Sequence, residues 1–426
     1  MRKYKLTGDN IDTVIGNVRL PSETNSRNET SVSNILEDVR KEGDSAIIQY
    51  TLKYDNFRLH NKSIRVSRRE IAQAHKKVSK AQILALLTLK KNIENVEGRT
   101  LKRLHWRSKA NDMSIEQIAV PIQSVGCYVP GGEASYPSTL LMTAVPAKIA
   151  GVPRIVVTTP PKKLTPLLLV AADLAGVSEI YRIGGVQAIA ALAYGTGTIR
   201  PVEKIVGPGN SYVTTAKILV SNRVGIDMPA GPTESIIYAD KKVDPKRIAL
   251  DLIAQAEHSF DAVCGLITLS TELACAVEKE LSDLMNSVER NDIITKSLNE
   301  KGFIILVSSV DQVSDFVNKF APEHLEIISD NPNQIIKHIN NVGVIIINAP
   351  CVITDYYAGV NHVLPTGGYA KMRSGLTALD YVKIMRTVKA SNPSIIRAFP
   401  TIKAFAASEG LPNHMKAIEY MIDKSE

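Results

Sequence analysis

Cysteines and long apolar segments are scarce in this chain of 426 residues. Its four cysteines, Cys127, Cys264, Cys275 and Cys351, form no CxxC pair and no closely spaced framework, so we expect reduced and mostly buried thiols. The first residues, MRKYKLTGDNID, lack the apolar segment of a signal peptide, and no apolar run reaches the length of a membrane span. These absences predict a cytoplasmic protein that crosses no membrane.

A clustered basic surface is also missing, although the net charge is +8 and the isoelectric point is about 9.1. Lysines and arginines are scattered, and the first hundred residues are rich in both signs of charge. This distribution favours a solvated surface over a nucleic-acid footprint, which would combine clustered basic and aromatic residues. The positive balance would help to attract a cofactor that carries phosphate.

The order of helical and apolar segments predicts an α/β protein. Residues 29–97 repeat apolar side chains with the spacing of amphipathic helices. After residue 115, short β-branched runs alternate with helical stretches, as in the βαβ units that build parallel sheets. Two series of strands are expected, one at 154–159, 179–185 and 204–209, and one at 235–240, 263–270, 303–308 and 342–348. From about residue 380 the pattern becomes helical again.

We therefore expect two Rossmann-like parallel-sheet domains, discontinuous in sequence, with small helical elements at both ends of the chain. Residues 1–105 would form a helical segment that joins the second α/β domain. The first α/β domain would span residues 106–229 and the second residues 230–370, followed by a helical tail over 371–426.

No GxGxxG fingerprint is present, so a standard dinucleotide-binding turn is excluded. Three glycine-rich turns nevertheless follow predicted strands: VPGG (129–132), IGGVQ (183–187) and GPGN (207–210). Ligands of open α/β sheets bind beyond the carboxyl ends of the strands, where these turns would lie. They are equally consistent with a nucleotide pocket and with plain connections between strand and helix.

Four of the eight histidines lie in polar clusters: QAEH (255–258), APEHLEI (321–327), DYYAGVNHVLPTGG (355–368) and EGLPNH (409–414). Gln255 and His258 close a helical pattern and would share one helix face. Together with Asp355, on a segment without helical or strand periodicity, they would suit a divalent metal such as zinc. The spacing alone does not distinguish a metal site from structural side chains.

Glu323 and His324 allow two interpretations. If they follow a strand and line a cleft, the pair suits general acid and base catalysis, because histidine titrates near neutrality and glutamate can activate water. If Pro322 instead begins a surface helix, Glu323 would only stabilise its first turn.

Taken together, these stretches resemble the histidinol dehydrogenase family over most of the chain. The similar motifs run in order from VRKEGDSAIIQYTLKYD through YVPGG, GGVQAIAALAYGT, KIVGPGN, IDMPAGPTE and the four histidine clusters. The resemblance implies a zinc-dependent, NAD-linked homodimer with shared active sites. Such an enzyme oxidises L-histidinol through L-histidinal to L-histidine, the last steps of histidine biosynthesis.

The resemblance also implies a role for each site residue. Glu323 and His324 would be catalytic, with His324 taking the hydroxyl proton and Glu323 activating water. The implied metal ligands are Gln255, His258, Asp355 and, from the partner subunit, His414. Substrate would contact these ligands and Thr233, His324, His362 and Glu409, the last from the partner, and NAD would contact Tyr128, Gln187 and Asn210.

One segment departs from the family pattern. Many members carry Ser-Pro-Glu, and a glycine just before the Asp-Tyr pair, where this chain reads NAPCVITDYY with Cys351 and Thr354. No implied ligand is lost.

Two other hypotheses for the function are a related enzyme that oxidises another polar alcohol and a regulatory protein that binds metal or nucleotide without turnover. The Glu323–His324 pair favours an enzyme, because a binding protein needs no acid and base.

Overall fold

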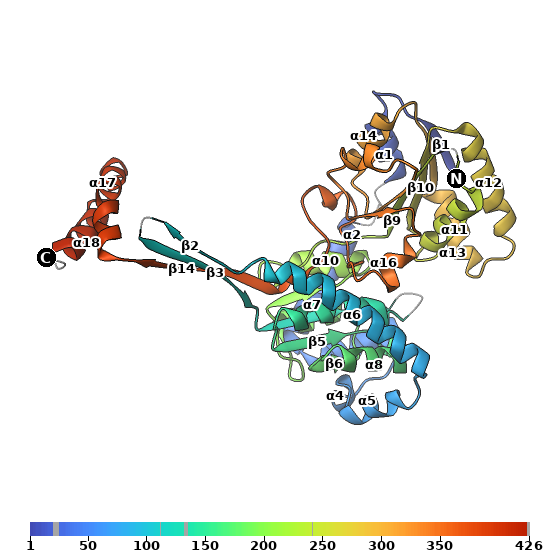
Figure 1. The fold of residues 1–426 in the computed structure, drawn as a ribbon. Helices are drawn as coiled ribbons and strands as arrows, with labels where there is room; N and C mark the ends of the chain where they lie inside the picture. Colours follow the sequence, from blue (N-terminus) through green and yellow to red (C-terminus); the bar gives the residue numbers. More distant parts are fainter. Residues whose placement is uncertain (20–24, 111, 132–134, 241, 424–426) are drawn as a thin grey trace. The chain divides into compact units, whose positions relative to one another are not determined.

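The computed structural model describes residues 1–19, 25–110, 112–131, 135–240 and 242–423. They form two compact units (Figure 1). Unit 1 comprises Met1–Glu97 and Ile122–Tyr381, and unit 2 comprises Gly98–Pro121 and Val382–Glu426. Unit 1 contains two parallel sheets, so the predicted α/β class is confirmed. The predicted domain boundaries stay a prediction.

Sheet A contains six parallel strands in the order β1-β11-β10-β9-β12-β13. Their bounds are β1 (Arg2–Lys5), β11 (Phe303–Leu306), β10 (Val263–Thr268), β9 (Glu234–Ala239), β12 (His324–Ile328) and β13 (Val344–Ile347). Helices α1 (Ile11–Val18), α14 (Val310–Phe320) and α15 (Asn333–Ile336) pack on one face, and α11 (Pro245–Ala256), α12 (Thr271–Leu284) and α13 (Asn291–Glu300) pack on the other.

Burial on both faces explains why the strands of sheet A read as continuous apolar runs. Successive side chains of a strand point to opposite faces. In β9, Ile236 and Tyr238 enter the core beneath α1 and α14, while Ile237 and Ala239 enter the core beneath α11 and α12. Both sets are apolar because neither face of the strand meets water.

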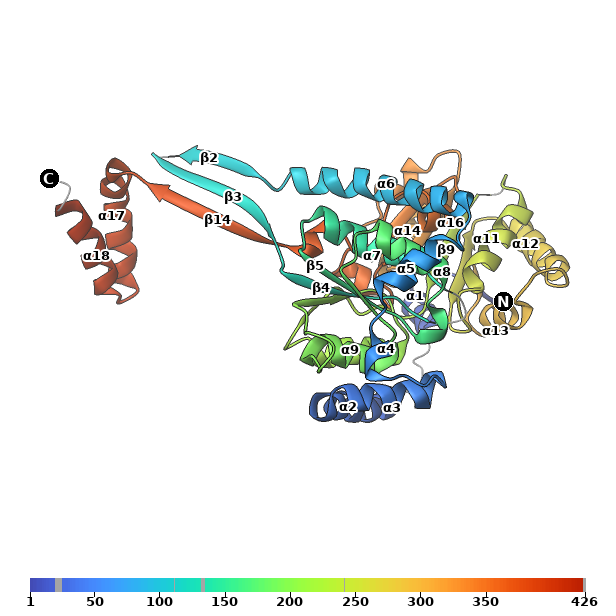
Figure 2. The same cartoon turned by 90° about the horizontal axis from the view of Figure 1, so that it is seen from below.

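Sheet B contains five parallel strands in the order β6-β5-β4-β7-β8. Their bounds are β6 (Glu179–Tyr181), β5 (Arg154–Thr158), β4 (Ser124–Tyr128), β7 (Lys204–Val206) and β8 (Gly225–Ile226). Helices α2 (Asn25–Glu42), α3 (Asp44–Asp55), α9 (Gly185–Tyr194) and α10 (Ser211–Val220) share one core with this sheet. Figure 2 shows α9 and α2 stacked below the sheet and α7 (Pro137–Ile149) above it.

The remaining elements of unit 1 are short or lie at its surface. They are α4 (Asn61–Ile64), α5 (Arg68–His75), α8 (Pro166–Leu174), α16 (Val352–Tyr356), η1 (Pro161–Lys163), η2 (Tyr369–Lys371) and η3 (Ala378–Tyr381), together with α6 (Lys80–Lys102), which ends in unit 2. The helical prediction for residues 29–97 is therefore confirmed.

Unit 2 is an antiparallel three-stranded sheet followed by two helices. The strand order is β14 (Val382–Ala390), β3 (Met113–Pro121) and β2 (Trp106–Ala110), and the helices are α17 (Asn392–Ser408) and α18 (Pro412–Asp423). The helical prediction from residue 380 onward is wrong for β14. All nine of its residues pair with residues of β3, so long-range pairing overrides the local pattern.

The cysteines agree with the sequence prediction. Cys127, Cys264 and Cys351 are buried, Cys275 is exposed, and all four are free. In the part of the chain that the structure describes, we find no helix with the length and apolar character needed to span a bilayer.

A packing prediction concerns Gly265, in the centre of β10. A Cβ atom at this position would lie 2.1 to 2.6 Å from ring atoms of the buried Phe303. Phe303 also packs against Phe316 and Phe320, so its ring has little room to move. We expect Gly265→Ala to lower the free energy of unfolding by about 1–3 kcal/mol, measured by urea denaturation.

The matched control is Gly16→Ala on the exposed face of α1, where an added Cβ meets nothing within 4 Å. Alanine in a helix is more stable than glycine by roughly 0.5–1 kcal/mol, so this variant should unfold at equal or higher urea concentration. Equal unfolding midpoints for the two variants would contradict the packing argument.

Candidate active site

A cavity of about 660 Å³ lies among residues of unit 1 where edges of the two sheets meet. Sheet B contributes residues that follow its strands, including Pro130 after β4 and Asn210 after β7. Sheet A contributes residues that precede or begin its strands, including Thr233 before β9 and Glu323 before β12. The carboxyl edge of sheet B therefore faces the amino edge of sheet A.

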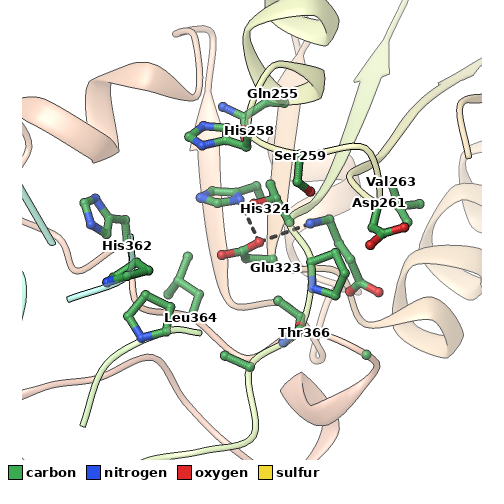
Figure 3. Close-up of a pocket in the computed structure, with 18 of the residues that line it drawn as sticks. Gln255, His258, Ser259, Asp261, Val263, Glu323, His324, His362, Leu364 and Thr366 are labelled. Carbon is green, nitrogen blue, oxygen red and sulfur yellow. Dashed lines mark hydrogen bonds and ion pairs between the residues drawn. The ribbon is translucent and has the colours of Figure 1, made fainter. Parts of the chain in front are cut away.

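Glu323 and His324 both line this cavity, and Figure 3 shows their side chains together. The interpretation that they follow a strand is wrong, and so is the surface helix from Pro322. They follow α14, which ends at Ala321 in the left-handed region at a φ of 52°, and His324 begins the buried strand β12. The sharp turn lets two consecutive side chains reach one space.

Glu323 is held by a single backbone donor. Its Oε2 accepts a hydrogen bond from the peptide nitrogen of Glu234 at 3.1 Å and lies 3.8 Å from Nδ1 of His324. Burial raises the pKa of the Glu323 carboxyl well above its usual value, and the negative charges of Glu234 and Asp355 raise it further. A carboxyl in this environment is a stronger base than an exposed one.

His324 is neutral at physiological pH. Burial lowers its pKa to about 3, with smaller contributions from His362 and His258. Among the residues that the structure describes, both of its ring nitrogens are buried without a hydrogen-bond partner. Unpartnered buried nitrogens are unfavourable unless a ligand or water satisfies them. The neutral ring therefore has a nitrogen lone pair open to a hydrogen bond from a bound molecule.

Gln255, His258 and Asp355 lie along the same cavity. Helix α11 ends at Ala256, so His258 lies just beyond the helix and only Gln255 is within it. Asp355 belongs to the short helix α16, which corrects its assignment to an irregular segment. Burial raises the pKa of Asp355 to about 6 and lowers the pKa of His258.

These three side chains fit a divalent cation. The amide oxygen of Gln255, the imidazole of His258 and the carboxylate of Asp355 are ligand types that divalent cations accept. Asp355 Oδ1 lies 3.7 Å from Nδ1 of His362. Burial lowers the pKa of His362 to about 4, so this neutral ring supplies no positive charge to the buried carboxylate. A bound cation would supply it. No group of three or more His, Cys, Asp or Glu side chains in the described ranges makes a complete site.

His362 and Thr233 also line the cavity. The Nε2 atom of His362 lies 3.1 Å from the hydroxyl of Thr139 on α7, which fixes the ring plane. The backbone carbonyl of Thr233 accepts a hydrogen bond of 2.8 Å from Val263, so the residue is tied to the start of β10.

Of the predicted NAD contacts, only Asn210 is among the described residues that line the cavity. Its Oδ1 caps α10 by accepting from the nitrogen of Val213 at 3.1 Å. Tyr128 ends β4 and Gln187 lies in the first turn of α9, and both are buried. The Tyr128 hydroxyl accepts a hydrogen bond from the Gly185 nitrogen at 3.1 Å. All three expected glycine-rich turns follow strands of this sheet.

Glu409 and His414 belong to unit 2 and are exposed, at the end of α17 and the beginning of α18. The described cavity is built from unit 1 alone.

Sequence reasoning missed the residues that hold the cavity loops. A buried ion pair joins Lys217 to Asp227, and Lys217 also donates to the carbonyls of Gly207 and Met228 at 2.9 and 3.1 Å. The Thr366 hydroxyl accepts from the nitrogen of Gly231. The near-complete burial of Lys217 has no signal in the sequence, where its neighbours look like those of an ordinary amphipathic helix.

Comparison with known proteins identifies relatives across the whole chain. The family model described as histidinol dehydrogenase matches residues 19–422. A histidinol dehydrogenase of Methanothermobacter thermautotrophicus is 44% identical over 392 residues, which is 91% of each chain. One of Streptococcus mutans is 41% identical over 429 residues and covers 100% of both chains.

A solved structure agrees with these sequence matches. The crystal structure of histidinol dehydrogenase from Elizabethkingia anophelis superposes with a TM-score of 0.93 at 33% identity, covering 100% of this chain and 98% of that one. Fold and sequence both match over the full length, and the oxidoreductase class predicted from the motifs is confirmed. The chain therefore belongs to the histidinol dehydrogenase family.

Proposed function

We propose that this chain oxidises L-histidinol to L-histidine through L-histidinal, in two NAD-linked steps at one zinc-containing site, as a homodimer in the cytoplasm. The observation that carries the proposal is the enclosure of Glu323 and His324 in one cavity with Gln255, His258 and Asp355. A base, a water-activating carboxyl and a set of metal-ligating atoms are the groups that both oxidations require.

The zinc ion would be held by Gln255, His258 and Asp355 of one chain and by His414 of the other. Zinc would supply a Lewis-acidic anchor for the imidazole and amine nitrogens of the substrate. The buried Asp355 carboxyl, which lines the same cavity as Gln255 and His258, supports this assignment. His362, Thr233 and the partner's Glu409 would hold the rest of the substrate.

In the first oxidation, His324 removes the hydroxyl proton of histidinol while the carbinol carbon loses a hydride. NAD is the oxidising co-substrate and accepts one hydride in each step. We assign its contacts to Tyr128, Gln187 and Asn210. A neutral imidazole is required for this step, and the low pKa of His324, about 3, supports that state.

In the second oxidation, Glu323 takes a proton from water as the water oxygen attacks the aldehyde carbon. The resulting hydrate anion gives the second hydride to NAD, and the carboxylic acid so formed releases its remaining proton to become the carboxylate of histidine. The raised pKa of Glu323 supports its role as base, since a basic carboxyl accepts a proton from water more readily. Enclosure of the site would keep the reactive aldehyde bound between the two steps.

The exposed apolar surface of unit 2 supports the homodimer. Nine of its described large apolar side chains are exposed to 41% or more: Trp106, Ile384, Met385, Val388, Ile396, Phe405, Leu411, Tyr420 and Met421. All residues of β14 after Val382 are exposed, so this sheet has little core of its own. A sheet of three strands needs an apolar face packed against something else, and a second chain would provide it.

The first prediction concerns turnover. Purified, zinc-loaded protein should form two NADH for each histidine produced from L-histidinol, because both hydrides leave from the same carbon. Chelation should abolish the reaction, and zinc should restore it. Absorbance at the NADH band and chromatographic identification of the product measure the ratio. If the protein binds zinc and NAD but forms no NADH from histidinol, the proposed substrate is wrong and another amino alcohol is indicated.

The second prediction separates the two bases. His324→Ala should abolish the first oxidation, because no other group would take the hydroxyl proton. Glu323→Gln should spare the first hydride transfer and slow the second by on the order of 10²–10⁴-fold. Single-turnover NADH formation from histidinol and from histidinal resolves the steps. Equal losses of both steps in Glu323→Gln would refute this division of roles.

The third prediction tests the shared site by subunit mixing. His414→Ala and Asp355→Ala should each be inactive alone, since each lacks a metal ligand in every site. Exchange of subunits between them should restore about a quarter of the wild-type activity, because half of the dimers would carry one intact site. Mixing Asp355→Ala with His258→Ala is the control and should restore none. Equal activity in both mixtures would argue against a shared site.

A further inference from the structure

Arg19 lies in the wall of the active-site cavity, outside the motifs that define the proposed chemistry. It follows the last residue of α1 and forms the end of that helix. Its guanidinium carbon lies 3.8 Å from the centre of the Phe320 ring, a cation–π contact that fixes the side chain against α14.

The guanidinium group forms a two-pronged ion pair with Glu234. Nε donates to Oε1 at 2.8 Å and Nη2 donates to Oε2 at 2.7 Å. The side chains are only 18% and 5% exposed, so the pair is largely removed from water. Parallel donation from a planar guanidinium fixes both the distance and the orientation of a carboxylate.

Glu234 in turn contacts the proposed water-activating residue. Its peptide nitrogen donates the 3.1 Å hydrogen bond to Oε2 of Glu323. Nη2 of Arg19 also lies 3.5 Å from the carbonyl of Ala321, in the turn that places Glu323 in the cavity. One guanidinium therefore holds the start of β9 and the turn before β12.

Charge gives Arg19 a second effect on the same carboxyl. The charge of Glu234 raises the pKa of Glu323, because like charges repel strongly in a region of low dielectric constant. Arg19 cancels this charge at contact distance. Without it, an unpaired buried carboxylate would remain beside Glu323, and the local structure would shift to admit water or a proton.

We propose that Arg19 is a positioning residue for Glu323, holding the Glu234 peptide nitrogen against the Glu323 carboxyl and cancelling the charge of the neighbouring Glu234 carboxylate. The inference rests on the proposed function of Glu323 as the base that activates water. The Glu234 backbone also contacts His324, but the Glu234 charge, which the Arg19 fork cancels, acts directly on Glu323. It follows that Arg19 acts chiefly on the second oxidation, and the first, which uses His324, changes less.

The test compares both oxidations in Arg19→Met, which keeps an apolar chain of similar length over Phe320 but removes the charge. Single-turnover NADH formation from histidinal should slow by on the order of 10–100-fold. Formation from histidinol in its first turnover should change much less. Arg19→Lys retains the charge without the fork, so its loss in the second step should be intermediate.

A double variant distinguishes an electrostatic effect of Arg19 on Glu323 from a loss of protein stability. Arg19→Met with Glu234→Gln removes both charges but keeps the peptide nitrogen that donates to Glu323. It should recover a large part of the second step, whereas a merely structural role predicts a further loss. Thermal unfolding of each variant, measured alongside, shows whether the recovery occurs without a matching gain in stability.

The matched control is the Arg154–Glu179 pair of sheet B. Arg154 donates to the two Glu179 oxygens at 2.9 and 3.2 Å, and the side chains are 14% and 8% exposed. Neither is among the described residues that line the cavity. Arg154→Met should lower stability as Arg19→Met does and leave the ratio of the two oxidation rates unchanged.

Equal slowing of both oxidations in Arg19→Met, or the same change of ratio in Arg154→Met, would overturn the proposal. So would the absence of recovery in the double variant. Glu323→Gln is measured in the same assay. A normal second oxidation in that variant would instead overturn the proposed role of Glu323, so the two failures are distinguishable.

Discussion

Removal of water from Glu323 and His324 is the constraint on which the rest of the site depends. Desolvation keeps the imidazole neutral and the carboxyl basic, and it acts only because two sheets close around the cavity. Helices cover both faces of each sheet. The walls of the cavity are therefore formed by the strand ends, the carboxyl ends in sheet B and the amino ends in sheet A. The fold thus supplies the environment, and the side chains supply the chemistry.

Buried ion pairs hold the loops that form those walls. Lys217 and Asp227 join the turn after β7 to the segment before β9, and Arg19 and Glu234 join α1 to the same segment. Such pairs contribute little net stability, because desolvation opposes their attraction, but they fix geometry strongly. Loops rich in glycine and proline have few side chains that could anchor them. The ion pairs of Lys217 with Asp227 and of Arg19 with Glu234 anchor these loops instead.

Unit 2 has a different physical character from unit 1. Its sheet exposes apolar side chains, and its helices carry the exposed residues Glu409 and His414. The four-ligand metal site proposed above is incomplete within unit 1. If unit 2 forms the proposed dimer, assembly and catalysis are linked, because the same unit carries His414, the proposed fourth ligand.

From the sequence alone we could predict the α/β class, the helices of residues 29–97, the family, and seven of the eleven strands described in sheets A and B. Strands β1, β4, β8 and β12 were missed. The predicted features depend on local periodicity and on motifs that are contiguous in the chain.

The sequence did not predict strand β14, whose pairing with β3 joins residues more than 260 positions apart. It also misplaced Glu323 and His324 after a strand, because the direction of the turn at Ala321 is not encoded in periodicity. Two features are seen only in the tertiary structure: the amino edge of sheet A faces the cavity, and Arg19 lies beside Glu234. Both depend on how distant segments pack, which no local pattern contains.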